Sequence, residues 1–399
     1  MNVAVIGMQF GDEGKGKIVD YLASDFDIIA RYCGGSNAGH TVVIGNKKFK
    51  LHLVPSGALR GKIGVLGNGM VIDLQVLREE LRELKEAGFE PKIIISSRAH
   101  VVTPLHKEME ALEEKVRNIG TTRRGIGPTY ETKVKRVGIR IIDIFNQDAL
   151  KKKLRLISTL WHLDKNDEEI ENIAKELSSL GKEFKENVKD TELWLNQAIS
   201  AGKSVLFEGA QGTMLDVDFG TYPFVTSSNT NSLGLFPGLG IPPKYLDKVI
   251  GVAKAYTTRV GEGPFPTEIH GELADMLRNK GNEYGATTGR PRRIGWLDLP
   301  ILRYSKLING IEEIAITKID VLQNLREIEV GVKYSCKGES FEYPPPFLEK
   351  CKPVYESLDG WSSMDDEEFQ RYLRFIEENI CVKIKIVSYG AEREKTMRL

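Results

Sequence analysis

The chain has 399 residues, of which 41% are apolar and 28% charged, a composition typical of a globular protein rather than a disordered one. Its 56 acidic and 56 basic side chains balance, so no net field favours nucleic acid or an anionic membrane as a partner. No apolar run approaches the ~18 residues that cross a bilayer, and we expect neither kind of partner.

The first predicted unit is a strand, a glycine-rich loop and a helix. Residues 2–7 form a β-branched apolar run, and the glycine-rich loop covers residues 8–16. From Lys17 onward, apolar side chains recur with helical spacing. A second apolar run at 27–32 predicts another strand. Glycine-rich loops between a strand and a helix are a common setting for bound phosphate.

The next predicted elements alternate between strands and a helix. Residues 40–54 favour a hairpin around the turn at Gly45 and Asn46. Strands are expected at 63–66 and 92–96, with a charged amphipathic helix at 74–87 between them. Such alternation indicates βαβ units, so we expect an α/β fold with a largely parallel sheet.

The second half of the chain contains one helical stretch and four further strands. Residues 147–201 are rich in Lys, Glu and Leu, which predicts a helical insertion whose charges form a solvated face. A run of three prolines at 344–346 predicts a peripheral excursion at about 333–365. No linker is apparent, so we expect a single domain over residues 1–399. The four strands are expected at 204–208, 248–255, 313–318 and 382–387.

The cysteines favour a reducing compartment. Cys33, Cys336, Cys351 and Cys381 include no C-x-x-C pair. We interpret all four as free thiols rather than as a disulfide framework or a zinc site. This interpretation predicts a cytoplasmic protein.

The glycine-rich loop nearly satisfies the phosphate-binding pattern G-x-x-x-x-G-K-[ST] at residues 11–18. Its backbone N–H groups can turn toward an anion, and Lys17 can reach the outer phosphates of a nucleotide. Ile18 stands where the pattern has a hydroxyl for Mg²⁺. Asp12 adds a carboxylate, which a bound triphosphate would repel. Its presence is accounted for if a cation lies between the two groups or if the carboxylate serves as a base. The alternative is that Asp12 only caps the helix.

A second glycine-rich loop, at 33–42, follows the second predicted strand. Loops at the carboxyl ends of parallel strands line the ligand crevice, so this loop is expected opposite the first. It offers backbone amides, the Asn37 side chain and the imidazole of His40. His40 follows Gly39 with no apolar face to bury it, which favours a functional role over a structural one.

An arginine-rich loop at 285–293 combines Arg290, Arg292 and Arg293 with threonine hydroxyls and glycines. Guanidinium groups bind carboxylates in a bidentate manner, and a flexible loop can enclose a small dicarboxylate. The alternative is a solvated basic turn, which accounts for the charge but not for the run Gly-Ala-Thr-Thr-Gly.

The predicted strand at 313–318 leads into the motif Thr-Lys-Ile-Asp at 317–320. The Asp320 carboxylate can accept both N1–H and N2–H of guanine, a donor pair that adenine lacks, while the Lys318 stem can lie along the base. In base readout such a bidentate contact discriminates by about 1–3 kcal/mol. After a phosphate loop, this short motif indicates GTP.

Three other classes of protein share part of this pattern. A regulatory GTPase would share the phosphate loop and the T-K-x-D motif, but it would not need the arginine loop or Gln211 beside a glycine turn. A ligase that uses ATP would have no reason for Asp320. A non-catalytic nucleotide-binding module is disfavoured, because the charge of Asp12 weakens simple binding of a triphosphate.

Together these motifs resemble those of the adenylosuccinate synthetase family. The resemblance runs in order from residue 9 to residue 320 and is highly specific, whereas 147–200 and 333–380 carry little of it. The matching segments are QFGDEGKGK at 9–17, GGSNAGHT at 34–41, GTTRRGIGP at 120–128, FEGAQGT at 207–213, VTSSN at 225–229, TTGR at 287–290, GWLD at 295–298 and TKID at 317–320.

The resemblance implies a P-loop-type GTP-binding ligase with a large mixed, mainly parallel central sheet, helices on both faces and inserted subdomains. Such an enzyme ligates IMP and L-aspartate to form adenylosuccinate, GDP and phosphate through a 6-phosphoryl-IMP intermediate, in AMP biosynthesis and purine salvage. Removal of the N1 proton turns O6 of IMP into a nucleophile for the γ-phosphoryl group. Asp12 would be the base, a role that gives roughly 10²–10⁴-fold, and His40 would donate to the γ-phosphate.

The resemblance also implies a homodimer and one Mg²⁺ per subunit, held by the Asp12 carboxylate and the Gly39 carbonyl. The catalytic group would be Asp12, Lys17, His40 and Gln211. GTP would contact Gly11, Asp12, Glu13, Gly14, Lys15, Gly16, Lys17, Gly39, His40, Thr41, Arg292, Lys318, Asp320, Ser388 and Gly390.

The two other substrates have their own implied residues. Arg136 would reach the partner subunit's IMP, and Lys133 would assist. IMP would contact Asp12, Lys15, Asn37, Ala38, Gly39, His40, Thr122, Arg136, Gln211, Thr226 and Arg290. L-aspartate would contact Ala286, Thr287, Thr288, Gly289, Arg290 and Arg292.

Two segments depart from the family pattern. Residues 388–393 read Ser-Tyr-Gly-Ala-Glu-Arg where the family has Ser-Thr-Gly-Pro-Asp-Arg. This keeps Ser388 and Gly390 as guanine contacts and puts their neighbours in question. Pro291 interrupts the arginine run and is expected to stiffen that loop.

Overall fold

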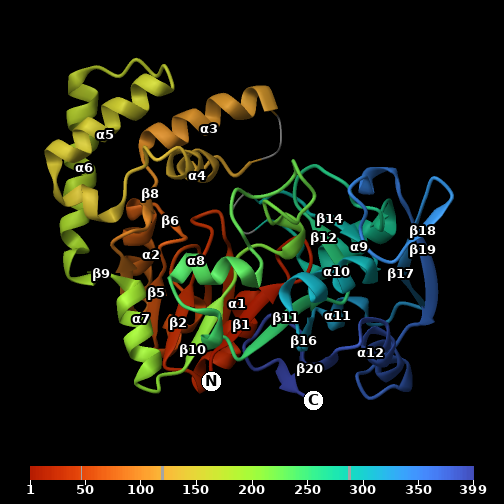
Figure 1. Ribbon diagram of the computed structural model, residues 1–399. Helices are drawn as coiled ribbons and strands as arrows, with labels where there is room; N and C mark the ends of the chain where they lie inside the picture. The colour runs from red at the N-terminus through yellow and green to blue at the C-terminus, as the bar shows by residue number, and fades with distance from the viewer. Residues whose placement is uncertain (46, 118–120, 286–288) are drawn as a thin grey trace.

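The computed structural model describes residues 1–399 apart from 46, 118–120 and 286–288, and its centre is a ten-stranded sheet (Figure 1). Neighbouring strands are parallel except for the last pair, β20 with β21, so the prediction of a mainly parallel α/β fold is confirmed. From one edge to the other the strands are β21 (Thr396–Arg398), β20 (Lys383–Ser388), β16 (Glu313–Thr317), β11 (Lys248–Lys254), β1 (Val3–Gly7), β10 (Val205–Glu208), β2 (Ile28–Arg31), β5 (Ile63–Leu66), β7 (Lys92–Ser96) and β9 (Val188–Lys189).

Both faces of the sheet are buried, because parallel strands need cover on each side. On β1, Val3 and Val5 point to one face and pack with Ile18 of α1 (Lys15–Leu22). Ala4 and Ile6 point to the other face and join a larger core. Helices on both faces are therefore confirmed. The larger core is completed by α7 (Thr191–Ser200), α8 (Leu235–Leu239), α10 (Leu299–Asn309) and α12 (Glu367–Ile380).

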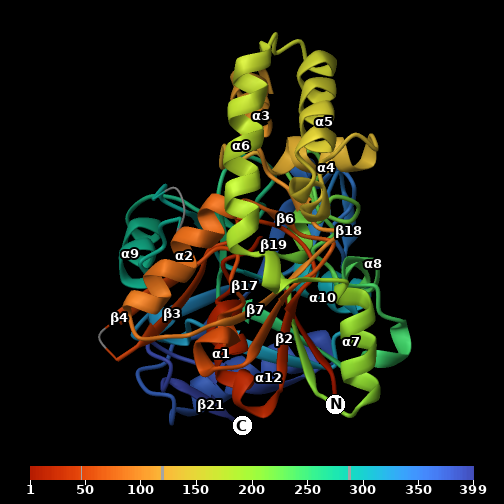
Figure 2. The same ribbon diagram turned by 90° about the vertical axis from the view of Figure 1, so that its left-hand side faces the viewer.

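A group of helices rises above one end of the sheet (Figure 2). Leu150, Leu154 and Ile157 recur at helical spacing on α5, and their side chains are buried in a second hydrophobic core. Asn166 begins α6 with a capping box, in which Asn166 and Glu169 each bond the other's backbone. The group contains α3 (Pro104–Arg117), α4 (Ile126–Val134), α5 (Gln147–Leu160) and α6 (Asp167–Glu183), with α2 (Leu74–Glu86) at its base.

Smaller elements frame the central sheet. The predicted hairpin is confirmed, since β3 (His40–Ile44) pairs antiparallel with β4 (Lys47–Leu51). Within the described ranges, no helix has the length and apolarity needed to cross a membrane. The remaining short elements are β6 (Val71–Ile72) with β8 (His100–Val101), β12 (Thr257–Arg259) with β14 (Arg293–Gly295) and β13 (Glu268–Ile269), and the helices α9 (Glu272–Gly281) and α11 (Ile319–Leu322).

The segment expected as a peripheral excursion forms a sheet that its prolines did not predict. The long strand β17 (Glu327–Cys336) pairs antiparallel with β18 (Glu339–Phe341) and β19 (Lys352–Asp359), and it pairs in parallel with β15 (Leu297–Asp298). The three prolines lie in the connection between β18 and β19. The sheet packs against α10 and α12 at the side of the molecule shown at the right of Figure 1.

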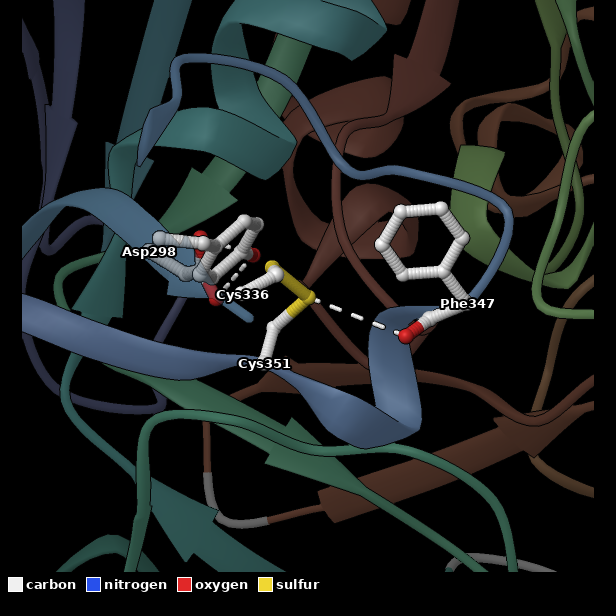
Figure 3. Close-up of a disulfide and its surroundings, with 5 residues drawn as sticks. Asp298, Cys336, Phe347 and Cys351 are labelled. Carbon is white, nitrogen blue, oxygen red and sulfur yellow. Dashed lines mark hydrogen bonds between the residues drawn. A yellow bond between two sulfur atoms is a disulfide. The ribbon is translucent and has the colours of Figure 1, made fainter. Parts of the chain in front are cut away.

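The expectation of four free thiols is wrong for two of them. Cys336 and Cys351 form a disulfide with their Cα atoms 4.4 Å apart (Figure 3). The pairing of β17 with β19 ends at Ser335 opposite Lys352, and the disulfide joins the residues next to this pair, which lie 15 positions apart in sequence. Spacing alone cannot reveal such a pairing. Cys33 and Cys381 are free thiols, as expected.

Candidate active site

A pocket of about 960 Å³ lies at the carboxyl edge of the ten-stranded sheet. Six neighbouring strands (β1, β2, β10, β11, β16 and β20) end here, and ligands of open α/β sheets bind outside the carboxyl ends of strands. Most of the residues predicted from the sequence line this pocket. They are Gly11, Asp12, Gly14, Lys15, Gly16, Lys17, Asn37, Ala38, Gly39, His40, Thr41, Thr122, Gln211, Thr226, Gly289, Arg292, Lys318, Asp320, Ser388 and Gly390.

Other predicted residues lie elsewhere. Within the described part of the chain, Glu13, Arg136 and Arg290 are not among the lining residues. Glu13 is buried inside the phosphate loop, whereas Arg136 and Arg290 are exposed, the former just beyond the end of α4. The three expected aspartate contacts Ala286, Thr287 and Thr288 lie outside the described residues.

The phosphate loop is held in shape by its own acid. The Glu13 carboxylate accepts backbone N–H bonds from Gln9 at 3.0 Å and Gly11 at 2.9 Å, and it pairs with Lys15 at 2.6 Å. Gly14 is the N-cap of α1, and no side chain caps this helix. Asp12 is therefore not the cap of α1, and its carboxylate is left for the pocket.

The Asp12 carboxylate meets the arginine loop directly. Arg292 donates from Nε to Oδ2 of Asp12 at 2.8 Å, and it donates from Nη1 to the buried carboxylate of Glu283. Asp12 has a positive φ of 59°, which is a strained conformation for a residue other than glycine. The structure thus brings the extra acid of the phosphate loop and the expected dicarboxylate-binding arginine into contact.

His40 is backed by a buried acid that the sequence analysis did not identify. Nδ1 of His40 contacts Glu208, whose side chain also accepts from the Ser56 N–H at 2.8 Å and from the Ser56 hydroxyl at 2.7 Å. Burial lowers the pKa of His40, although Glu208 opposes this shift. Burial alone would raise the pKa of Glu208, but His40 and Arg31 outweigh it and lower that pKa. The ring is therefore fixed with Nδ1 directed at Glu208.

Lys17 links the phosphate loop to the carboxyl-terminal segment. Its ammonium donates to the Ser388 hydroxyl at 2.8 Å, to the Gly390 carbonyl at 3.1 Å and to the Lys395 carbonyl at 2.8 Å. Burial lowers the pKa of Lys17 to about 8, while Asp320 and Glu392 act in the opposite direction. The expected phosphate-binding lysine therefore also lies beside the expected guanine contacts.

Asp320 presents an unsatisfied acceptor to the pocket. Its Oδ1 atom is buried and has no hydrogen-bond partner among the described residues. A buried carboxylate oxygen without a donor is costly, so this geometry favours a ligand with N–H groups. Lys318 has a positive φ of 61° and donates to the Gly281 carbonyl at 2.6 Å, which fixes the turn before α11.

A second unsatisfied acceptor lies on the opposite side of the phosphate loop. Oε1 of Gln211 is buried without a hydrogen-bond partner in the described ranges, and Gln211 has a positive φ of 54°. Asn37 donates to the Thr226 hydroxyl at 3.4 Å, which joins two predicted contacts. These neutral polar groups could bind a nucleotide distinct from one at Asp320.

The site also contains residues that the sequence analysis missed. Glu208 and Lys254 are the last residues of β10 and β11, and both are completely buried. Arg259 lies over the Phe10 ring at 4.4 Å and lines the pocket. A buried strand that ends in a charged residue is the pattern that could have found the first two, and Glu208 also lies within the segment FEGAQGT at 207–213.

The expected ligands of a divalent cation are two oxygen-bearing groups, the Asp12 carboxylate and the Gly39 carbonyl. Among the described residues, no group of three or more His, Cys, Asp or Glu side chains could hold a metal ion. Asp12 and Gly39 both line the pocket. Mg²⁺ commonly takes one or two carboxylates and completes its shell with phosphates and water, so this donor set fits Mg²⁺ bound together with a nucleotide.

Comparison with known proteins gives a consistent result. Residues 4–397 match the family model for adenylosuccinate synthetase. The chain is 46% identical over 420 residues to the adenylosuccinate synthetase of Thermoplasma volcanium, covering 99% of this chain and 96% of the relative. It is 46% identical over 428 residues to that of Halothermothrix orenii, covering 100% and 98%. The solved structure of fully ligated adenylosuccinate synthetase from Plasmodium falciparum has a TM-score of 0.94 at 39% identity, covering 100% of this chain and 99% of that one.

Proposed function

The chain belongs to the adenylosuccinate synthetase family and is a GTP-hydrolysing ligase that joins IMP and L-aspartate in AMP biosynthesis; we propose that the pocket at the carboxyl edge of its sheet is the active site. One observation carries this proposal. Asp12, His40, Gln211, Arg292 and Asp320 come from five different parts of the chain and all line the same pocket.

Asp12 would act as the base that removes the N1 proton of IMP. O6 then attacks the γ-phosphorus of GTP, the bond from this phosphorus to the β-phosphate oxygen breaks, and GDP leaves. The amine of L-aspartate next attacks C6 of 6-phosphoryl-IMP and displaces phosphate. Support comes from the Asp12 carboxylate, which lines the pocket and does not cap α1.

His40 would stabilise the charge of the transferring phosphoryl group. With Nδ1 directed at Glu208, Nε2 is the nitrogen that can donate to a γ-phosphate oxygen. A phosphate nearby favours the imidazolium form, and Glu208 balances that charge from behind. Glu208 is therefore proposed as a positioning residue for His40.

The guanine of GTP would lie at Asp320 and the carboxyl-terminal segment. The unsatisfied Oδ1 of Asp320 supports acceptance of guanine N–H bonds. Lys17 contacts Ser388 and Gly390, so the phosphates and the base would meet one connected surface. The other proposed GTP contacts are Gly11, Glu13, Gly14, Lys15, Gly16, Gly39, His40, Thr41 and Lys318. Arg292, which the resemblance implied for both GTP and L-aspartate, is proposed for L-aspartate.

IMP would bind across the phosphate loop from Asp320. The unsatisfied Oε1 of Gln211 and the bonded pair Asn37 and Thr226 support this assignment. L-aspartate would bind at the arginine loop, with Arg292 reaching its carboxylate from within the pocket. Further proposed contacts are Lys15, Ala38, Thr122 and Arg290 for IMP, and 286–290 for L-aspartate.

Mg²⁺ would be held by the Asp12 carboxylate and the Gly39 carbonyl. It would neutralise charge on the nucleotide phosphates. Arg292 donates to Oδ2 of that carboxylate, so the cation would take Oδ1 or replace Arg292 at Oδ2.

The enzyme is proposed to be a homodimer in which Arg136 completes the partner subunit's IMP site. Its role in AMP biosynthesis supports a cytoplasmic location, whereas the Cys336–Cys351 disulfide removes the argument from free thiols. The proposed IMP contacts Thr122, Gln211 and Thr226 are neutral, and a 5′-phosphate dianion beside them would need a charged donor from elsewhere. Arg136 is exposed outside its own subunit's pocket, which supports a role across an interface.

An omission assay tests this function. Phosphate release from GTP and the ultraviolet absorbance of adenylosuccinate are measured with IMP and L-aspartate supplied singly and together. Sustained product formation is expected only with both. Asp12→Asn should lower kcat by roughly 10²–10⁴-fold while GTP binding persists in calorimetry. A variant with a near-normal rate would exclude Asp12 as the base.

A further inference from the structure

A buried row of charges lies directly behind Arg292. Lys254, Glu283, Arg292 and Asp12 follow one another with alternating sign, and only the last two line the pocket within the described part of the chain. Lys254 and Glu283 are fully buried. Neither belongs to a sequence motif that pointed to function. Their position nonetheless connects the end of β11 with the arginine loop.

The Glu283 carboxylate is fully engaged, with its two oxygens used differently. Oε1 accepts from Lys254 at 3.0 Å and from the Tyr256 hydroxyl. Oε2 accepts from Nη1 of Arg292. Burial alone would raise the pKa of Glu283, but the charges of Lys254 and Arg292 outweigh it and lower that pKa to about 2. Glu283 is therefore a fixed anion whose orientation does not depend on solvent.

The backbone ties the same two residues together. The Arg292 N–H donates to the Glu283 carbonyl at 2.9 Å, and the Gly285 N–H donates to the Arg290 carbonyl at 2.8 Å. These bonds close the base of the arginine loop. Glu283 and Arg292 thus stand at its two ends, and the Glu283 side chain fixes the guanidinium relative to that base.

We propose that Glu283 is the positioning residue that orients Arg292 toward the carboxylate of L-aspartate. The inference rests on the proposed role of Arg292. Arg292 keeps the hydrogen bond from Nη1 to Glu283. Its Nε group releases the Asp12 carboxylate and donates to the carboxylate of L-aspartate instead. The planar guanidinium allows this exchange because its donors lie in a fixed fork. Lys254 and Tyr256 hold Glu283 from the far side, so the fork cannot rotate away when Asp12 leaves.

A purely structural salt bridge predicts a different result. Breaking a buried ion pair that serves only stability lowers the free energy of unfolding. It does not change the KM of one substrate more than the KM of the others. A positioning role acts on the substrate that Arg292 contacts. The comparison of three KM values, one for each substrate, therefore separates the two accounts.

The test compares Glu283→Gln with a matched control. Glu283→Gln should raise KM for L-aspartate about 10- to 100-fold, as expected when a charge-assisted bond is lost, with KM for IMP and GTP changing much less. Glu283→Asp keeps the charge and should recover part of the loss. The control is Glu268→Gln, which removes the acid partner of the adjacent Arg293, bonded at 2.8 Å, and should leave all three KM values unchanged.

Two further variants make every outcome decisive. Arg292→Leu should raise KM for L-aspartate; if it does not, the proposed role of Arg292 fails independently of Glu283. If Arg292→Leu raises this KM and Glu283→Gln does not, or raises all three equally, the positioning role is overturned. Should Glu283→Gln not fold, Tyr256→Phe decides, because it removes one bond to Oε1 and keeps every charge. A selective rise in KM for L-aspartate supports the inference, and its absence overturns it.

Discussion

Three pocket residues that follow a central strand share a strained backbone, and a fourth pocket residue with a positive φ, Asn282, lies at the end of α9. Asp12, Gln211 and Lys318 have φ values of 59°, 54° and 61°. Each follows the carboxyl end of a central strand, where the chain must turn sharply at the sheet edge. Such a conformation costs about 1–3 kcal/mol and persists where surrounding contacts enforce it. The strain therefore marks positions at which side-chain direction is set before a substrate arrives.

The base specificity of the enzyme is predicted to depend on Asp320. Asp320→Asn replaces one acceptor oxygen with a donor that faces the guanine N–H groups. KM for GTP should rise about 10-fold or more, in line with 1–3 kcal/mol of base discrimination. Xanthosine triphosphate, whose 2-oxo group accepts that donor, should become a better substrate. Steady-state kinetics with both nucleotides provide the measurement, and an unchanged KM for GTP would contradict the assignment.

Nucleotide binding is predicted to take up a proton at alkaline pH. Burial lowers the pKa of Lys17 to about 8 in the free enzyme. A bound triphosphate favours the charged amine and raises this pKa, so near pH 9 free Lys17 is mostly neutral and bound Lys17 is protonated. Affinity for GTP should therefore fall as pH rises above 8.

Calorimetry in buffers of different ionisation enthalpy measures this uptake. Near pH 7 Lys17 is protonated in both states and contributes no uptake. Lys17→Gln removes the titrating group, so the alkaline uptake should disappear even though binding is weaker. The same uptake in the variant would assign the proton to another group.

At the scale of elements, strand pairing in the sheet of β17, β18 and β19 brings together two cysteines that the sequence alone suggested were free thiols. The disulfide joins the end of β17 to the residue before β19, and Tyr334, two residues before Cys336, donates to the buried Asp298 at the start of α10. The sheet is thereby fixed both internally and against the central core. In the described part of the chain, neither cysteine lines the pocket.

Removal of this disulfide is predicted to lower stability without changing catalysis. The disulfide closes a loop of 15 positions. The chain-entropy model predicts that a loop of this length stabilises the folded state by about 3 kcal/mol. The double variant Cys336→Ala and Cys351→Ala should lose about that much unfolding free energy in urea titrations and keep its kcat. Cys381→Ser, which changes an exposed free thiol, is the control and should match the wild type. Equal stability of the double variant would show that the bond does not constrain the unfolded chain.

At the scale of the whole molecule, the proposed IMP site depends on Arg136 from a second subunit. Arg136 lies at the end of α4, in the helical group raised above the sheet (Figure 2). Large apolar side chains are exposed nearby, including Val134 on α4 at 79% and Leu156 on α5 at 45%. A second copy of the chain is the partner that the proposed shared site requires.

Subunit complementation tests the shared site. Arg136→Leu should raise KM for IMP about 10- to 100-fold and KM for GTP far less, because a charge-assisted phosphate contact is lost. Mixed with Asp12→Asn, it should regain activity, since one site of each heterodimer has both groups. With random exchange of equal amounts, about half of the dimers are mixed, and one of the two sites in each mixed dimer is intact. The expected activity is therefore about a quarter of that of the wild type. If confirmed exchange gives only the sum of the residual activities, Arg136 acts within its own subunit.

The sequence by itself determined the class of fold, and most of the site residues that it indicated line the pocket. Apolar runs and their spacing located the central strands, because a strand buried on both faces must be apolar throughout. The phosphate loop and the Thr-Lys-Ile-Asp motif were equally visible, since each works through residues adjacent in the chain. Even the start of α1, at Lys15 rather than Lys17, differs by only two residues.

The tertiary structure alone decided which distant residues meet. Glu208 behind His40, Glu283 behind Arg292, and Cys336 against Cys351 are pairs formed across loops and strands. Each depends on strand order and register, which follow from how the whole core packs. No local pattern encodes such a pairing, because the same residue types at the same spacing would be separate in another topology. The sequence therefore predicted the functional residues of short motifs. It did not predict the buried acids that orient them or the disulfide.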